Sequence, residues 1–123
     1  MLPYEKLVAW QQAHAVVLAV YRHTATFPAH ERFGLTAQTR RAAFSAAANI
    51  AEGAAKRGDA EFRRFLDISL GSLSELAYCL RLARDLGYLT DSAWAEVEAL
   101  RATAGKTTWG LYRSVAERVG RSR

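Results

Sequence analysis

Apolar residues recur at every third or fourth position in four stretches of the chain, which is the spacing of helices with one buried face. The four predicted helices cover residues 7–26, 36–55, 59–86 and 91–119. Strand formers are sparse, whereas Ala, Leu, Arg and Glu, which lose little rotamer freedom in a helix, dominate. Because the connections are short, the pattern predicts a single all-α domain, an up-down-up-down antiparallel four-helix bundle.

The first predicted helix has large residues on its expected buried stripe, namely Trp10, His14, Val17, Leu18 and Tyr21. Residues 1–6 are expected to be extended, because Pro3 disfavours helix at Leu2. The second helix is rich in alanine, so we expect it to lie close to its neighbours. Thr36 is its predicted N-cap, with Gly34 before it free to take a positive φ.

Residues 59–86 have the most regular pattern. The main stripe steps by four and three positions through Phe62, Leu66, Ser69, Leu73, Leu76, Leu80 and Ala83. A second apolar flank consists of Phe65, Ile68, Cys79 and Leu82. Two apolar flanks predict burial on two sides, inside the bundle and against another subunit. Asp59 is the expected N-cap and Gly87 the expected C′ residue.

The last predicted helix opens at Thr90 or Asp91. Its apolar side comprises Trp94, Val97, Leu100, Ala104, Leu111, Val115 and Val119. Gly105 and Gly110 lie inside it and predict a kink or a close approach. Residues 118–123 form a basic tail that we expect to be frayed.

The charge balance adds a functional constraint. The chain carries 17 basic and 12 acidic residues, a net charge of +5, which suits nucleic acid, an anionic membrane surface or an acidic protein as a partner. The lone cysteine, Cys79, cannot form an intrachain disulfide and is expected to be buried, as fits a reducing cytoplasm. We expect no signal peptide, because Glu5 and Lys6 lie among the first residues and no apolar run precedes a cleavage site. No apolar stretch approaches the length needed to cross a bilayer, and we expect no membrane as a partner.

Catalytic and metal-binding patterns are not apparent. None of the three histidines, His14, His23 and His30, follows a glutamate by three residues, as a carboxylate metal site in a bundle requires. Neither a Gly-x-Ser-x-Gly elbow nor a phosphate-binding glycine loop is present. We therefore expect no cofactor, no metal and no enzymatic activity. His14 is expected to be partly buried and hydrogen-bonded, and a deep pocket formed by His14, Arg41 and Glu52 would reopen the enzyme hypothesis.

Basic residues are the strongest functional lead. Antiparallel connectivity brings the end of the second helix, the start of the third and the end of the fourth to one end of the bundle. The candidate nucleic-acid-binding residues are Arg40, Arg41, Lys56, Arg57, Arg63, Arg64, Arg118, Arg121 and Arg123. The alternative is an ordinary solvated surface, with pairs such as Asp59–Arg63 and with Asp67 beside Arg63 and Arg64.

Five motifs occur in order along the chain. They are Val8-Ala-Trp-Gln-Gln-Ala-His, Phe27-Pro-x-x-Glu-Arg-Phe-Gly-Leu-Thr-x-Gln, Ser45-x-x-x-Asn-Ile-Ala-Glu-Gly, Glu61-Phe-x-x-Phe-Leu-x-Ile-Ser-Leu-Gly-Ser-Leu-Ser-Glu-Leu and Asp85-Leu-Gly-Tyr-Leu. Over about residues 4–120 this set resembles the four-helix-bundle family named after proteins encoded in 23S rRNA intervening sequences. That name records a genomic location and not an activity.

The resemblance implies a bacterial protein with a left-handed bundle that forms a ring-like homo-oligomer, most often a pentamer. A related branch, the accessory proteins of diversity-generating retroelements, binds nucleic acid through a basic surface. The family signature is matched by Asn49, Glu52 and Gly53, which we interpret as structural, with Glu52 partnered by Arg41 or Arg57. Ala47 stands where the family commonly has proline, which predicts a straighter second helix.

Two functions follow from these observations. The first is a homo-oligomeric accessory protein that binds the RNA or DNA backbone without reading bases. The second is a homo-oligomeric scaffold, or a protein–protein interaction module, that has no nucleic-acid partner.

Overall fold

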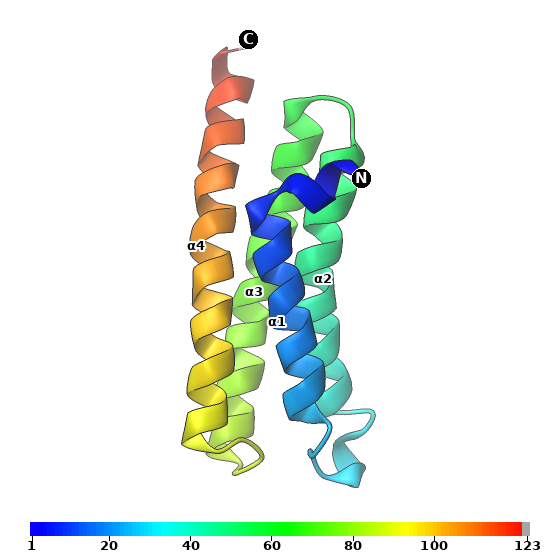
Figure 1. Cartoon of the computed structure of the whole chain (residues 1–123), viewed down its shortest axis with the longest axis vertical. Helices are drawn as coiled ribbons and strands as arrows, with labels where there is room; N and C mark the ends of the chain where they lie inside the picture. The colour runs from blue at the N-terminus through cyan, green and yellow to red at the C-terminus, as the bar shows by residue number, and fades with distance from the viewer. Residues whose placement is uncertain (122–123) are drawn as a thin grey trace.

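Four long helices run alternately up and down, so each is antiparallel to the next (Figure 1). The computed structural model describes residues 1–121, and Arg123 lies outside this range. The helices are α1 (Val8–Thr24), α2 (Leu35–Ala55), α3 (Asp59–Asp85) and α4 (Asp91–Arg121), with two short 3₁₀ helices, η1 (Pro3–Lys6) and η2 (Ala29–Glu31). The predicted four-helix bundle is confirmed.

The buried face of α1 differs from the prediction. It is formed by small residues, Ala9, Ala13, Val16, Ala19 and Val20. Of the predicted stripe, His14 is exposed and stacks on Trp10, whereas Leu18 and Tyr21 are 54% and 47% exposed. Small side chains let α1 approach its neighbours closely, so the larger ones lie at the edges of the contact. The outer side of α1 therefore carries large apolar groups.

The segment before α1 is also more ordered than predicted. Leu2 is extended, but Pro3 begins the 3₁₀ helix η1 instead of preventing one. Proline suits the first position of a helix, because a backbone N–H there would have no acceptor within the helix. Tyr4 from η1 then packs edge-on against Trp10, with ring centroids 4.7 Å apart.

The contact between α2 and α3 is close because α2 presents alanine and glycine. A Cβ atom on Gly53 would lie 2.8 Å from Phe65 Cβ and 3.0 Å from Phe62 Cδ1. Gly53 is therefore required by packing, which the sequence pattern did not reveal. Phe65 and Cys79, half of the second apolar flank of α3, are buried within this chain, whereas Ile68 of the same flank is 40% exposed. Burial also raises the pKa of the Cys79 thiol.

Two hydrogen bonds made by serine hydroxyl groups connect α2 to α3. Ser69 Oγ donates to the Ala46 carbonyl at 2.7 Å, and the hydroxyls of Ser45 and Ser72 are 2.8 Å apart. Asn49 Nδ2 donates to the carbonyl and hydroxyl oxygens of Ser45 at 2.8 and 3.0 Å. Asn49 therefore orients the serine that reaches across to α3, and this contact supports a structural role for the signature asparagine.

The start of α2 is capped differently from the prediction. The helix begins at Leu35, whose N–H donates to Glu31 Oε1 at 3.0 Å, so Thr36 is not the cap. Gly34 has φ −103°, and a Cβ there would lie 2.6 Å from Glu31 Oε1, so glycine provides room and not a positive φ. The Tyr88 hydroxyl donates to Glu31 Oε2 at 3.0 Å. The Leu35 N–H, followed by this hydroxyl, lowers the pKa of Glu31.

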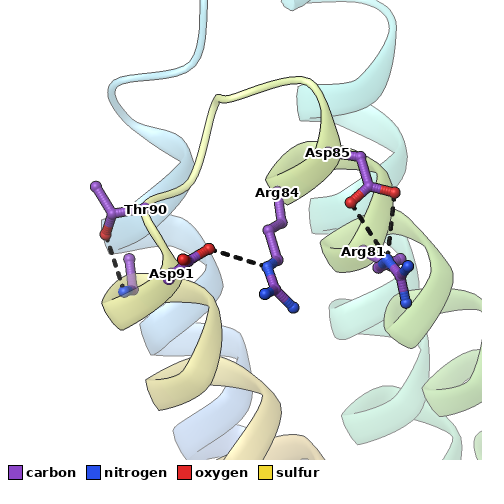
Figure 2. A network of polar contacts seen from close by, with 6 residues as sticks. Arg81, Arg84, Asp85, Thr90 and Asp91 are labelled. Carbon is purple, nitrogen blue, oxygen red and sulfur yellow. Dashed lines mark hydrogen bonds and ion pairs between the residues drawn. The ribbon is translucent and has the colours of Figure 1, made fainter.

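The ends of α3 and α4 follow standard capping geometry with one difference. Gly58, with φ +88°, occupies the position before α3, so Asp59 is the first helical residue and not the N-cap. Gly87 has φ +80° and closes α3 in the predicted C′ position, where its N–H donates to the Arg84 carbonyl at 3.0 Å. Thr90 Oγ1 accepts the Ala93 N–H at 3.0 Å, so Thr90 caps α4 (Figure 2).

Helix α4 is continuous over 31 residues. A Cβ on Gly110 would meet no atom within 4 Å, and one on Gly105 would meet only the end of Arg101 at 3.9 Å, so neither glycine marks a close approach. The helix continues through Arg121, so the described part of the tail is helical. No helix within residues 1–121 is long and apolar enough to span a membrane.

Candidate nucleic-acid interface

The α2–α3 connection and the C-terminal end of α4 lie at the same end of the bundle (Figure 1). Six of the nine candidate residues belong to these segments or to the first turns of α3, and we call this region the basic end: Lys56, Arg57, Arg63, Arg64, Arg118 and Arg121. Arg123 lies outside the described residues. The convergence expected from the connectivity is therefore present for these six.

Arg40 and Arg41 do not belong to the basic end. They lie in the first half of α2, roughly 22 Å along the helix axis from Lys56. Arg40 Nε donates to Thr24 Oγ1 at 2.8 Å, and its guanidinium lies 4.7 Å from the Tyr21 ring centroid. Arg41 Nη2 donates to Gln38 Oε1 at 2.7 Å. Both arginines contact their neighbours at the other half of the bundle.

Two arginines of the basic end are held by carboxylates. Arg118 Nε and Nη2 each donate to an oxygen of Asp59 at 3.2 Å, which ties α4 to the start of α3. Arg64 Nη2 donates to Glu61 Oε2 at 3.2 Å. This hydrogen bond, with the accompanying charge attraction, lowers the pKa of Glu61. These two guanidinium groups are therefore partly neutralised.

Other cations at the basic end are unpaired. The expected Asp59–Arg63 pair is absent, because Asp59 binds Arg118 instead. Within residues 1–121, Arg57, Arg63 and Arg121 have no hydrogen-bond or ion-pair partner. The signature residue Glu52 is exposed, and it pairs with neither Arg41 nor Arg57, contrary to the prediction. The guanidinium groups of these three arginines are therefore free to bind an anion.

The opposite end of α3 provides a contrast. Arg81 Nε lies 3.2 Å from Asp85 Oδ2, and Arg84 Nε lies 3.0 Å from Asp91 Oδ1 (Figure 2). Arg84 also lies over the Trp94 ring, 4.4 Å from its centroid. The arginines beside the α3–α4 turn are thus already engaged, unlike those at the basic end.

An open groove of about 490 Å³ runs between α3 and α4 beside the basic end. It is lined by Ala60, Arg63, Arg64, Asp67 and Tyr112. The groove therefore combines two guanidinium groups, one carboxylate and one phenol ring. Asp67, predicted to neutralise its arginine neighbours, forms no ion pair within residues 1–121.

Two aromatic residues of this region were missed by the sequence analysis. Tyr112 stacks on Trp109, with ring centroids 5.4 Å apart and an interplanar angle of 15°. Trp109 is 50% exposed. Both residues lie beside the apolar side of α4 and are flanked by the exposed cations Lys106 and Arg113. Tyr112 is partly buried against the core, so the available signal was Trp109, an exposed aromatic residue between basic residues and three positions before a tyrosine.

Charge is distributed unevenly between the helices of the basic end. Residues 52–67 contain four basic and four acidic residues and are neutral overall. The C-terminal part of α4 has Arg113, Arg118 and Arg121 against the single acid Glu117. The excess positive charge therefore comes from α4, which also supplies the aromatic pair.

Comparison with known proteins places the chain in a family. A family described as 23S rRNA-intervening sequence protein matches residues 5–109. A crystal structure of a protein of unknown function from the S23 ribosomal protein family of Bacteroides thetaiotaomicron superposes with a TM-score of 0.79. It is 20% identical in sequence, and the match covers 85% of this chain and 98% of that one, so the likeness concerns the fold. No curated protein matches the chain. Arg113 and Arg121 lie beyond the matched residues.

Proposed function

The chain belongs to the family of 23S rRNA-intervening sequence proteins, and on this premise we propose that it is a non-enzymatic protein that binds the backbone of RNA or DNA at its basic end. The observation that supports this proposal is the unpaired guanidinium of Arg63 in the groove between α3 and α4. A guanidinium matches phosphate geometry with paired donors, and one without a carboxylate partner binds phosphate without first losing an ion pair.

Such binding tolerates different sequences. Phosphate contacts position a nucleic acid but carry no base information. Arg57 and Arg121 are exposed and add cations at the same end of the bundle, one from the α2–α3 connection and one from the end of α4. The chain therefore has cations for several phosphates of one strand at a single end.

A pair of charge-matched variants tests this assignment. Arg57→Gln combined with Arg63→Gln removes two free cations from the basic end. Arg22→Gln combined with Arg41→Gln removes the same charge from exposed positions toward the other end. For single-stranded RNA, losing two phosphate contacts should flatten the slope of log affinity against log salt by about 1.4. Equal slopes in the two double variants would contradict the assignment to the basic end.

A second property is favoured by a separate surface. Leu18, Tyr21 and Phe44 are large apolar residues, 54%, 47% and 59% exposed, on the adjacent helices α1 and α2. Arg40, one turn before Phe44, stacks on Tyr21 and connects the two helices at this surface. Exposed apolar groups gathered in this way are typical of subunit contacts. We propose that copies of the chain associate through it into a ring-like homo-oligomer, with five subunits as the family resemblance implies.

Sedimentation velocity distinguishes this assembly from a monomer. The wild-type protein should sediment as a species several times the 13.6 kDa of one chain. Leu18→Asp combined with Phe44→Asp should give the monomer, because a buried carboxylate in a subunit contact is costly. Phe33→Asp is the matched control, since Phe33 is 88% exposed and lies in the connection between α1 and α2. A monomeric wild-type protein would refute the assembly and leave nucleic-acid binding to be tested alone.

A further inference from the structure

The aromatic pair on α4 gives the basic end a second type of binding group. Trp109 is half exposed and stacks nearly parallel on Tyr112, and Tyr112 lines the groove that contains Arg63. Among the exposed Phe, Tyr and Trp side chains of residues 1–121, Trp109 is the one that stacks on another ring. An indole held against a second ring is preordered, so a ligand that stacks on it loses little side-chain entropy.

The bundle core does not account for the position of Trp109. The buried residues of this part of α4 are Ala104, Thr108 and Val115, which form the stripe facing the other helices. Trp109 lies to one side of that stripe, where half of its surface contacts solvent. Its neighbours on α4 include Lys106 and Arg113, which are exposed and have no ion-pair partner in the described chain.

We infer that the basic end recognises unpaired nucleotides, whose bases stack on Trp109 while Arg63 and Arg113 hold the adjacent phosphates. This inference rests on the proposed function and specifies its substrate class as single-stranded RNA or DNA. Bases in a duplex already stack on each other and do not expose their faces to a side chain. Unpaired bases expose them, and an aromatic platform beside cations is the usual way in which proteins bind single strands.

The carboxylate of Asp67 allows a test of whether the ligand of the groove is an anion. Its carboxylate shares the groove with Arg63 and has no ion-pair partner in residues 1–121, so it repels a phosphate placed there. Asp67→Asn should therefore strengthen binding of a short oligothymidine at low salt. A cationic or neutral ligand in the same groove would be weakened or unaffected by that change.

Fluorescence anisotropy with three labelled probes tests the stacking contact. The probes are a short oligothymidine, the same strand with abasic spacers in place of its central bases, and a duplex of equal length. Wild-type protein should bind oligothymidine about tenfold more tightly than the abasic strand, the magnitude of one stacked base. Trp109→Ala should remove this difference, and Trp109→Phe should retain most of it. Tyr78→Ala is the control, because Tyr78 is 68% exposed on α3 and stacks on no ring.

The outcomes separate the two proposals. If Trp109→Ala binds oligothymidine as tightly as wild type, or if wild type does not distinguish the abasic strand, the stacking inference is overturned while backbone binding stands. Equal wild-type affinities for the single strand and the duplex would also overturn it. If no probe binds at about 50 mM salt, where electrostatic binding is strong, both the inference and the proposed function fail. The abasic comparison uses wild-type protein and is independent of how any variant folds.

Discussion

Replacing Gly53 with alanine tests the packing of α2 against α3. Alanine is favoured over glycine in a helix by about 1 kcal/mol, so propensity alone predicts stabilisation. The added Cβ, however, would lie 2.8 Å from Phe65 Cβ, whereas carbon atoms pack at about 3.5–4.0 Å. Both atoms are fixed to their backbones, so relief requires the two helices to move apart. Overpacking of this kind costs about 1–3 kcal/mol.

The net effect of Gly53→Ala is therefore destabilisation by about 1 kcal/mol, from a packing cost near 2 and a propensity gain near 1. Gly71 of α3 is the matched control, because it is exposed and a Cβ there would meet no atom within 4 Å. Gly71→Ala should stabilise the protein by up to about 1 kcal/mol. The two variants should thus differ by about 2 kcal/mol, or about 8 °C in melting temperature for a domain of this size.

Thermal unfolding followed by far-UV circular dichroism provides the comparison. Gly53→Ala should melt below wild type and Gly71→Ala above it. If both variants melt above wild type, the Gly53 backbone has room for a methyl group, and the close contact between α2 and α3 is wrong. If both melt below wild type, helix propensity does not determine how Gly71→Ala changes the stability.

Three further predictions concern single groups. Folding lowers the pKa of Glu31, so its carboxylate contributes stability above the unfolded pKa near 4.5 and loses it as the pH falls through the folded pKa. Wild type and Glu31→Gln should therefore differ in melting temperature at pH 7 and converge in acid. Ser69→Ala should cost about 0.5–1.5 kcal/mol in chemical denaturation, because the buried hydrogen bond to the Ala46 carbonyl is lost while that carbonyl keeps its helical N–H donor. Asp67→Asn should raise affinity for oligothymidine at low salt and leave the melting temperature unchanged within about 2 °C, whereas weaker binding would place the strand elsewhere.

Periodicity predicted the fold well where the main apolar stripe of a helix is regular. The stripe of α3 and the glycine at its C-terminal end were both correct, because each rests on local geometry. The first helix had two candidate faces, and the prediction chose the one with large residues. The structure fully buries the small one and leaves Trp10 and Val17 of the predicted face partly buried against the core. The distance between neighbouring helices is set by side chains on both, which one segment does not reveal.

The candidate site was predictable in position but not in detail. Connectivity alone predicted Arg57, Arg63 and Arg121 at one end of the bundle. Local spacing then paired Asp59 with Arg63, but Arg118, distant in sequence, binds that carboxylate and leaves Arg63 unpaired. Which acid neutralises which arginine depends on long-range contacts. For the same reason Trp109 was missed, since its importance comes from a groove that two helices form together.

The most direct test of the central claim is the salt dependence of wild-type binding to a single-stranded RNA between about 50 and 200 mM monovalent salt. The basic end supplies Arg57, Arg63 and Arg121, and Arg113 of α4 adds a fourth cation, so about four phosphate contacts should lower the affinity about 50-fold over this range. No binding at the lower salt concentration, or an affinity that does not change with salt, would contradict a nucleic-acid-binding function and favour the homo-oligomeric scaffold.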